Sequence, residues 1–516
     1  MEPGLVLVTI LCLCVSLHSL FNLFFHAKRL PPGPPTVPIL GNLLWLLKFS
    51  KNFSSIEPLL RQLRAKYGPV VTLYLGSRPS IFITTHEAAH RALVQTGSLF
   101  ASRPPALTTS SIFFSNQHTV STAPYGALWR LLRRNFMSRI HPSRLHLYSH
   151  GRKWALSVLK NKLMADVDQS SNNTGIVVVV GHFQHAMFCL LVCMCFGEKL
   201  EDNVIREIEA VQRASLTNFI RFNVFNFIPK LGKVLFPSLW KQLLEIRRNQ
   251  ENVLLPLIKA RQEEHKCDMN RASYVDSLLH LRIPDSGREF SDGELVSLCS
   301  EFINGGTDTS TTTLQWVMAN LVKQQEIQKK LLKEINSVTE EGREIEEEYL
   351  KKMPYLKAVI LETLRRHPPG HFILPRAVTE EIKFNGYDIP KNAIVNFTVA
   401  EMGWDPKVWE DPMEFKPERF MNNNGEEKEE EEVILFDIKG IREIKMMPFG
   451  AGRRVCPAIS MALLHLEYFV ANLVRDFEWN DENGCGEGVD LSEIQEFTMV
   501  MKNPLKVRIT PRRQIT

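Results

Sequence analysis

Most of this chain places apolar residues at the three- and four-residue spacing of helices. The clearest exceptions are residues 70–75 and 81–85, which are β-branched and apolar and are separated by Gly76-Ser77-Arg78-Pro79. Two such runs joined by a turn containing glycine and proline predict a hairpin. Helical patterns dominate the sequence that follows, so we expect a mainly α fold with a smaller β region.

The first apolar segment, residues 4–25, is long enough to cross a bilayer as a helix. A cleaved secretory signal would begin with basic residues and end in a small-residue cleavage site, whereas here Glu2 precedes the segment and Lys28-Arg29 follow it. Positive charge behind the segment indicates that the C-terminal side faces the cytoplasm. We therefore expect a retained N-terminal transmembrane helix, a single-pass anchor over residues 1–26, with a removed signal as the alternative.

The rest of the chain divides into a short hinge and one long body. The sequence Pro31-Pro32-Gly33-Pro34-Pro35 predicts a stiff spacer, because proline fixes its own φ and favours extended geometry in the residue before it. We assign residues 27–50 to this hinge and residues 51–516 to a single domain, since no internal repeat or long linker divides them. Hydrophobic residues make up 44% of the 516 residues, enough for a large core.

Charge and cysteine content narrow the possible functions. The formal net charge of +5 is small for this length and gives no argument for nucleic-acid binding. Nine cysteines, an odd number scattered through the chain, are not typical of a disulfide framework and fit a reducing compartment such as the cytosol. His182, His185, Cys193 and Cys195 raise the alternative of a zinc site, but they lie in an apolar run that favours a buried helix.

A loop near the C-terminal end carries the strongest chemical signal. Residues 448–458 read Pro-Phe-Gly-Ala-Gly-Arg-Arg-Val-Cys-Pro-Ala and lead into an apolar run of helical period. Pro457 suits the first turn of a helix, where a missing N–H costs nothing. Cys456 would then lie at or just before a helix N-terminus, where backbone dipoles favour the thiolate, a strong metal ligand. The alternative is a buried structural cysteine.

A second signal lies in the middle of a long helix. Ser291 and Glu294 have the spacing of a capping box, which marks where the helix begins. The glycine pair at 305–306 weakens the helix interior, and Thr309 can bond back to a carbonyl one turn earlier and bend the helix. An acid, Asp308, beside this alcohol suits proton delivery; the alternative is a glycine kink with incidental polar residues.

Three further patterns bear on the site. Trp129 and Arg133 share a helix face because they are four residues apart. Glu362 and Arg365 have apolar neighbours, which predicts a partly buried pair in a helix that begins near Pro354. Three arginines near Trp129 either form a basic surface for an acidic partner or serve only solubility: Arg130, Arg134 and Arg139.

The cysteine loop resembles that of the cytochrome P450 haem-thiolate monooxygenases. The family pattern Phe-x-x-Gly-x-Arg-x-Cys-x-Gly is met by Phe449, Gly452, Arg454 and Cys456, with Ala458 where the family usually has glycine. Residues 305–310 resemble the family's Ala/Gly-Gly-x-Asp/Glu-Thr-Thr/Ser motif, and the remaining motifs follow in the family's order. The resemblance runs from the anchor to the C-terminus and is closest to plant microsomal A-type members of family 89.

The resemblance implies roles for single residues. Cys456 is the axial ligand of a haem b iron, and Asp308 and Thr309 form a proton-relay pair. The other haem-binding residues are expected to be Arg454, Trp129, Arg133, Arg376, Phe449 and Gly452. A structural triad is expected from Glu362, Arg365 and Arg419. Substrate-pocket residues, by family position, are Ile112, Val120, Phe302, Phe372, Ile373, Phe497 and Thr498.

The implied activity is insertion of one oxygen atom from O2 into a hydrophobic small molecule, with electrons from NADPH through a cytochrome P450 reductase. The implied location is the endoplasmic reticulum membrane, with the catalytic domain in the cytosol. By family position, residues 222–240 resemble a segment that often dips into the membrane, although they could also be core. A reductase-independent haem-thiolate isomerase or dehydratase acting on hydroperoxides and a non-catalytic haem-binding membrane protein are the alternatives. Relatives of the isomerase class lack the acid–threonine pair that Asp308 and Thr309 resemble.

Overall fold

The computed structural model describes residues 13, 16, 30–37, 40–42, 56–75, 78–169, 176–219, 221–265, 273–339, 344–421, 436–482, 484 and 486–512. Of the anchor expected over residues 1–26, only Leu13 and Ser16 fall within these ranges, so that prediction lies outside the described residues. Among the helices described, none is both long and apolar enough to span a membrane.

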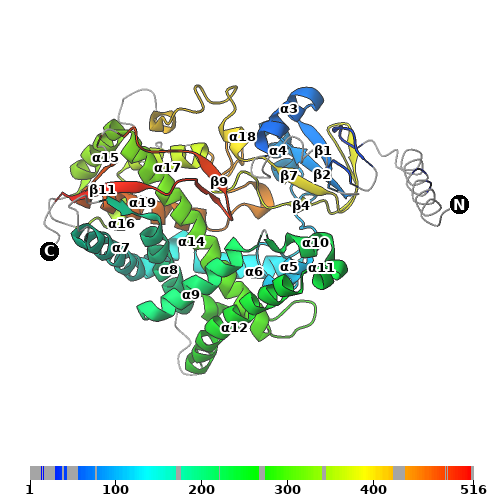
Figure 1. Cartoon of the computed structure of the whole chain (residues 1–516), viewed down its shortest axis with the longest axis horizontal. Helices are drawn as coiled ribbons and strands as arrows, with labels where there is room; N and C mark the ends of the chain where they lie inside the picture. The colour runs from blue at the N-terminus through cyan, green and yellow to red at the C-terminus, as the bar shows by residue number, and fades with distance from the viewer. Residues whose placement is uncertain are drawn as a thin grey trace. The chain divides into compact units, whose positions relative to one another are not determined.

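The chain forms two compact units, each with a core of its own (Figure 1). Unit 1 comprises Met1–Pro104, His371–Val408 and Asp437–Val455. Unit 2 comprises Pro105–Gly370, Trp409–Phe436 and Cys456–Thr516.

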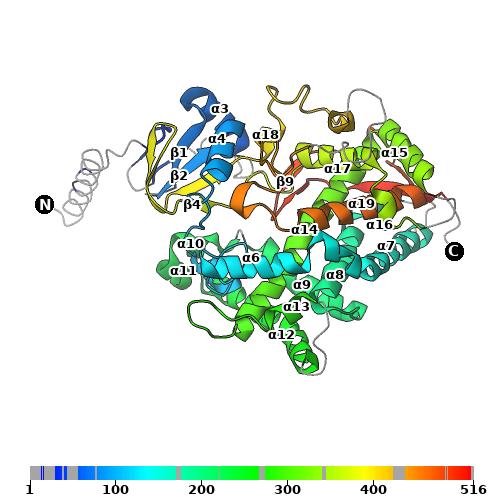
Figure 2. The same cartoon turned by 180° about the vertical axis from the view of Figure 1, so that it is seen from behind.

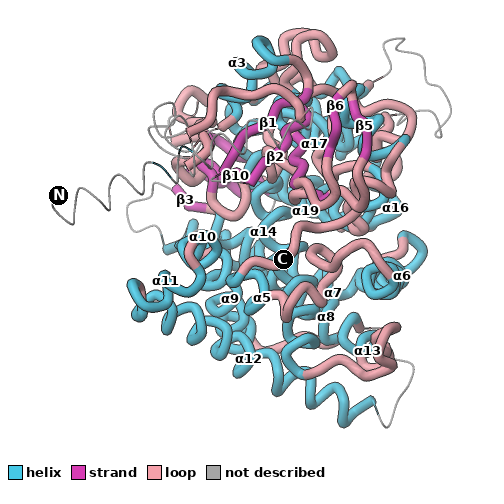
Figure 3. Tube along the Cα trace, turned by 90° about the vertical axis from the view of Figure 1, so that its right-hand side faces the viewer, coloured by secondary structure: helices cyan, strands magenta, loops and turns pink. Residues whose placement is uncertain are grey.

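A four-stranded sheet organises unit 1 (Figure 1), and Figure 3 shows its strands β1 and β2 in magenta. β1 (Val70–Leu75) pairs antiparallel with β2 (Arg78–Ile83), as the β-branched pattern predicts, although β2 begins three residues earlier than expected. β2 runs parallel to β7 (Ile394–Phe397), and β7 pairs antiparallel with β4 (Arg376–Ala377). The remaining elements of unit 1 are α3 (Glu57–Tyr67), α4 (His86–His90), η1 (Arg91–Gln95), β5 (Ile382–Phe384), β6 (Tyr387–Ile389), α18 (Ala400–Gly403) and η5 (Gly452–Arg454).

The described part of the proline-rich hinge is attached to this sheet. The Pro32 carbonyl accepts a hydrogen bond from the Thr72 N–H at 2.9 Å. The amide of Asn42 donates to the carbonyls of Pro34 and Pro35 at 3.2 and 2.9 Å. The prolines therefore lie along β1, and the folded body begins earlier than residue 51.

Unit 2 is mainly helical, in agreement with the fold class expected from the sequence (Figures 1 and 2). Its helices are α5 (Thr108–Phe113), α6 (Ala127–Arg139), η2 (Pro142–Tyr148), α7 (Ser149–Gln169), α8 (Val180–Phe196), α9 (Asp202–Thr217), η3 (Arg221–Asn223), α10 (Val224–Phe227), α11 (Pro229–Leu235), α12 (Pro237–His265), α13 (Tyr274–Leu278), α14 (Asp292–Lys323), α15 (Gln325–Val338), α16 (Glu347–Leu350), α17 (Pro354–Arg366), η4 (Pro417–Phe420) and α19 (Ile459–Asp476). Its strands are β3 (Ile176–Val178), β8 (Phe477–Asn480), β9 (Glu493–Gln495), β10 (Met499–Met501) and β11 (Lys506–Pro511).

The long helix α14 runs through unit 2 beside α8 (Figures 1 and 2). Its predicted capping box is present: the Ser291 hydroxyl accepts from the Glu294 N–H, and the Glu294 carboxylate accepts from the Ser291 N–H at 2.7 Å. α8 is buried on all sides from Phe183 to Phe196, which confirms the buried-helix interpretation of its cysteines. Within the described residues, no group of three or more His, Cys, Asp and Glu side chains could hold a metal ion.

Candidate functional site

The first half of the cysteine loop belongs to unit 1, and its shape depends on two glycines. Gly450 and Gly452 adopt φ angles of 69° and 71°, a region that L-residues with side chains rarely occupy. A Cβ atom on Gly452 would lie 1.8 Å from the carbonyl oxygen of Leu93, so only glycine fits there. The buried guanidinium of Arg454 donates to the Ala101 carbonyl, and Arg376 is likewise buried, in β4. Phe449 precedes these glycines in the same loop.

Cys456 stands apart from the other cysteines of the described chain. It is partly exposed and free of any disulfide, whereas the others are buried: Cys189, Cys193, Cys195 and Cys299. Its Sγ accepts a hydrogen bond from the Ala458 N–H at 3.4 Å. Burial of the sulfur raises the pKa of Cys456, while that N–H and the charge of Arg133 lower it by less. The described residues alone therefore favour the thiol over the thiolate at this position, and a bound metal ion would favour the thiolate.

The position of Cys456 corrects one detail of the prediction. α19 begins at Ile459 with Ala458 as its N-cap residue, so Pro457 precedes the helix instead of occupying its first turn. Cys456 therefore lies three residues before the first helical residue. The dipole effect of the helix end falls off within the first turn, which explains why burial dominates the pKa of the thiol.

Trp129 and Arg133 do share one face of α6, as their spacing predicts. The Arg133 guanidinium lies over the Trp129 ring, 5.5 Å from its centroid. Burial lowers the pKa of Arg133, and the charge of Cys456 acts in the opposite direction. Within unit 2, the thiol and one cation therefore act electrostatically on each other.

The two glycines in the middle of α14, Gly305 and Gly306, have different surroundings. A Cβ atom on Gly306 would lie 2.6 Å from Cδ1 of Leu191, so this glycine lets α14 pack closely against α8. Nothing lies within 4 Å of the corresponding position on Gly305, whose surface is exposed. The Thr309 hydroxyl donates to the Gly305 carbonyl at 2.9 Å, which is the predicted back-bond. α14 thus exposes a small-residue surface where a bulky flat group could approach.

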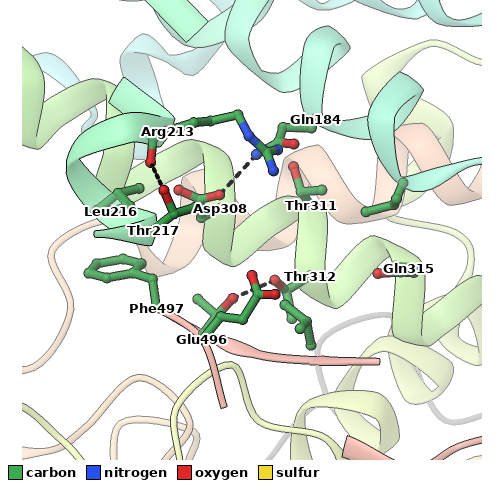
Figure 4. A pocket seen from close by; sticks show the side chains of 13 residues that line it. Gln184, Arg213, Leu216, Thr217, Asp308, Thr311, Thr312, Gln315, Glu496 and Phe497 are labelled. Carbon is green, nitrogen blue, oxygen red and sulfur yellow. Dashed lines mark hydrogen bonds between the residues drawn. The ribbon is translucent and has the colours of Figure 1, made fainter. Parts of the chain in front are cut away.

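The Asp308 side chain lines a cavity of about 80 Å³ on another side of α14 (Figure 4). Its Oδ1 accepts from the Gln184 amide at 3.1 Å. Burial raises the pKa of Asp308 to about 6, and the charge of Arg213 opposes this shift. Because Asp308 bonds to Gln184 while Thr309 bonds to Gly305, the structure does not join the predicted relay pair by a direct hydrogen bond.

Two predicted pocket residues line the same cavity as Asp308. Phe497 and Thr498 lie between β9 and β10, and the Thr498 hydroxyl meets that of Thr312 at 2.8 Å (Figure 4). Sequence reasoning missed Gln184 and Arg213, which line this cavity from α8 and α9. No local motif marks them, because they reach Asp308 from positions far away in the chain.

The other predicted pocket residues of unit 2 have mixed environments. Ile112 packs against the apolar cluster that contains Phe113. Phe302 stacks on Tyr274 with ring centroids 4.5 Å apart and lies against Phe136 at 5.5 Å, which makes it part of the core. Its expected place on a pocket wall finds no support in these contacts.

Val120 is buried, and its backbone is held by a residue that sequence reasoning missed. The Glu301 carboxylate, on α14, accepts the N–H groups of Val120 and Ser121, each at 2.7 Å. In unit 1, Phe372 packs edge-on against Phe82, and Ile373 packs against the core.

The expected structural triad is assembled in unit 2. Glu362 and Arg365 are fully buried and make two hydrogen bonds, at 2.7 and 2.8 Å. Arg419 reaches the same carboxylate at 3.4 Å, and its guanidinium also donates to the Asp411 carbonyl. These contacts tie α17 to the segment around η4.

Comparisons with known proteins identify the family to which this chain belongs. The family model described as Cytochrome P450 matches residues 31–510. The chain belongs to the cytochrome P450 family. This cytochrome P450 is 48% identical to Cytochrome P450 89A9 of Arabidopsis thaliana over 95% of each chain, which supports its place in plant family 89.

Two further relatives are enzymes by name. The Isoflavone 3'-hydroxylase of Medicago truncatula is 31% identical over 93% of this chain and 92% of its own. The phenylacetaldehyde oxime monooxygenase of Prunus mume is 30% identical over 97% and 94%. A solved zebra fish cytochrome P450 structure with abiraterone, 22% identical, matches with a TM-score of 0.72 over 88% of this chain and 99% of that chain, which shows the shared fold.

Membership establishes this cytochrome P450 as an oxidoreductase that binds haem iron. The residues present fit that group. Cys456 is the one described cysteine with exposed surface, Arg133 acts on it electrostatically, and Gly305 leaves part of α14 open.

Proposed function

We propose that this cytochrome P450 is a microsomal monooxygenase that oxidises a hydrophobic small molecule, with electrons from NADPH through a cytochrome P450 reductase. The carrying observation is that Cys456, a partly exposed residue, interacts electrostatically with Arg133 on a chain whose named relatives include a hydroxylase and a monooxygenase. In this proposal Cys456 holds the iron, and the haem carboxylates bind to Arg454, Arg376, Arg133 and Trp129.

When bound, the haem would supply the chemistry that reduces O2 and transfers one of its oxygen atoms to the substrate, the other leaving as water. The protein supplies protons and shape. Phe449 and Gly452 form the loop that carries the ligand. Asp308, with a pKa of about 6, is close enough to cellular pH to take up and release protons. Thr309 and ordered water would complete the route, since no direct bond joins the pair.

The ligand assignment is tested by Cys456→His. We expect the variant to lose the red-shifted band of the ferrous carbon monoxide complex, because that band requires a thiolate. Cys299→Ala is the matched control, since Cys299 is buried and should leave the band in place. A Cys456→His protein that kept the band would show that another cysteine holds the iron.

The reductase is proposed to dock on a basic surface of α6. Arg130 and Arg134 are exposed there, and Arg130 lies 5.7 Å from the Tyr125 ring centroid. Reversing the charge, as in Arg134→Glu, should raise the reductase concentration needed for half-maximal NADPH oxidation and flatten its salt dependence. Arg248→Glu, an exposed arginine on α12, is the control. Equal effects of both variants would count against this surface.

Location in the endoplasmic reticulum membrane is proposed from the apolar residues 4–25 and from an exposed patch on α10 and α11. Pro229 and Pro237 are the first residues of α11 and α12, where a missing N–H costs no hydrogen bond. Phe222 and Phe225 are buried, so part of residues 222–240 is core. The α10–α11 patch consists of the exposed Phe227, Leu231, Val234 and Leu235.

Deleting residues 1–26 should weaken membrane association while haem is retained, and the α10–α11 patch should give residual binding. Combining the deletion with Phe227→Ser and Val234→Ser should remove this residual membrane binding, as measured in a vesicle flotation assay. Loss of haem from the deleted protein would show that the segment belongs to the folded body.

The substrate is proposed to be hydrophobic because the expected wall residues Ile112, Val120 and Phe497 are apolar. Screening plant metabolite fractions for substrate-induced shifts of the haem spectrum tests this. NADPH-dependent oxygen consumption that requires the reductase separates a monooxygenase from a hydroperoxide isomerase and from a haem carrier.

A further inference from the structure

The cavity that holds Asp308 has a buried floor and an exposed mouth. The buried floor includes Gln184, Thr311 and Thr312. Arg213 from α9 and Glu496 from the segment between β9 and β10 are exposed and line the same cavity (Figure 4). Two groups of opposite charge, the Arg213 guanidinium and the Glu496 carboxylate, therefore lie at the solvent-exposed mouth of the cavity.

Two oxygen atoms on the floor have no hydrogen-bond partner among the described residues: Oδ2 of Asp308 and Oγ1 of Thr311. A buried polar atom without a partner costs about 1–3 kcal/mol, so such atoms are normally satisfied by water. A cavity of about 80 Å³ has room for two or three waters, each of which occupies about 30 Å³. The floor is thus built to hold a short chain of water.

Charged and polar groups on the neighbouring elements affect the pKa of Asp308. Arg213 on α9 stabilises its anion, whereas Glu209 on α9 and Glu496 destabilise it; Gln184 on α8 donates a hydrogen bond. Among the lining residues, Glu496 alone is both acidic and exposed, so it can exchange protons directly with bulk solvent.

We propose that Glu496 is the proton-entry residue of this enzyme and that water in this cavity carries the proton from Glu496 to Asp308, with Arg213 keeping Asp308 ionised between transfers. A proton leaves the Glu496 carboxyl for a water while another water protonates the Asp308 carboxylate, and bulk solvent then reprotonates Glu496. The inference rests on the proposed function, because this water chain would deliver protons to the proposed relay of Asp308 and Thr309.

The holoenzyme with its reductase tests the proposal, and NADPH-driven oxygen consumption needs no known substrate. Glu496→Gln should slow consumption about three- to tenfold, below the usual range for a general acid because water can partly replace the group. Its solvent isotope effect should rise, and millimolar formate should restore the rate, since the mouth is open. Glu487→Gln, an exposed acid outside the cavity, should change neither quantity.

A second measurement is independent of turnover. The infrared band of the protonated Asp308 carboxyl, identified by its loss in Asp308→Asn, should titrate near pH 6. Its midpoint should move upward in Arg213→Gln and downward in Glu496→Gln, because each variant removes one of the charges that act on Asp308.

The outcomes separate this proposal from the relay on which it rests. If Asp308→Asn is slow while Glu496→Gln keeps the wild-type rate and isotope effect, the entry role of Glu496 is wrong and the relay stands. If both variants match wild type, the relay itself is wrong. A Glu496→Gln protein that is slow but not restored by formate would show a structural role and overturn the proposal.

Discussion

Two buried carboxylates of unit 2, those of Glu362 and Asp308, differ in how completely they are hydrogen-bonded. Glu362 on α17 is completely inaccessible, and both of its oxygens are bonded: they accept from Arg365, from the Lys416 N–H and from Arg419. Asp308 on α14 has one oxygen bonded to the Gln184 amide and the other without a partner among the described residues. The Glu362 carboxylate is therefore fully hydrogen-bonded, whereas burial raises the pKa of Asp308 to about 6.

This difference separates a structural role from a chemical one. A buried charge that is fully hydrogen-bonded rigidifies its surroundings. A buried acid with a raised pKa and unfilled bonding capacity marks a site where a proton can arrive and leave. The α17 cluster, which consists of Glu362, Arg365 and Arg419, therefore fixes the fold, whereas Asp308 keeps the freedom that its proposed role as a proton carrier requires.

The largest effect is expected from breaking the α17 cluster. Glu362→Gln keeps the shape of the side chain but leaves the buried Arg365 without its countercharge, which should lower the free energy of unfolding by about 3–5 kcal/mol. Denaturant titration of the holoenzyme measures this loss. Glu326→Gln is the control, because Glu326 pairs with Lys329 on the exposed surface of α15 and should leave the midpoint unchanged. Equal midpoints for Glu362→Gln and wild type would remove the contrast between the two carboxylates.

The next effect concerns the alcohol beside Asp308. Thr309→Ala removes the hydroxyl that donates to the Gly305 carbonyl but leaves Cys456 and the open surface of α14 intact. Product formation per NADPH should fall about 10²-fold, the low end for a general acid–base group, while hydrogen peroxide rises. NADPH use, peroxide and product are measured together, with Thr313→Ala as control because Thr313 makes the same kind of back-bond one turn later. Unchanged coupling would leave Thr309 with a helix-bending role alone.

Local sequence signals predict a large part of this architecture. The capping box of α14, the hairpin of β1 and β2, and the helix that begins at Pro354 all follow from residues close together in the chain. The expected contacts between Glu362, Arg365 and Arg419 are also present, because family motifs name the residues involved.

What the sequence does not predict depends on packing between distant segments. Leu191 on α8 explains why Gly306 cannot carry a side chain, and no pattern around residue 306 indicates that contact. The contacts of Phe302 with Tyr274 and Phe136 likewise join residues that are far apart in the chain. Nothing in the sequence distinguishes Glu301 from the other polar residues of α14, yet its carboxylate accepts a hydrogen bond from the backbone N–H of Val120.

The smallest effect is the sharpest test of the contrast, because its sign is opposite to that of Glu362→Gln. The pKa of Asp308 is about 6 in the folded protein, above its ordinary value of 3.8. Between these two values the folded state binds more protons than the unfolded state, so folding stability falls as pH rises from about 4 to about 6 and stays reduced above that. A shift of about 2 pKa units corresponds to at most about 3 kcal/mol.

Asp308→Asn cannot ionise, so the variant escapes this penalty. At pH 7 it should be more stable than wild type by about 1–3 kcal/mol, and at pH 4 the two should be nearly equal, while oxygen consumption slows. Denaturant midpoints measured at both pH values check the result, with Glu487→Gln as the exposed control. A variant less stable than wild type at pH 7 would mean that the Asp308 carboxylate holds the fold together as Glu362 does, and its place as a proton carrier would be lost.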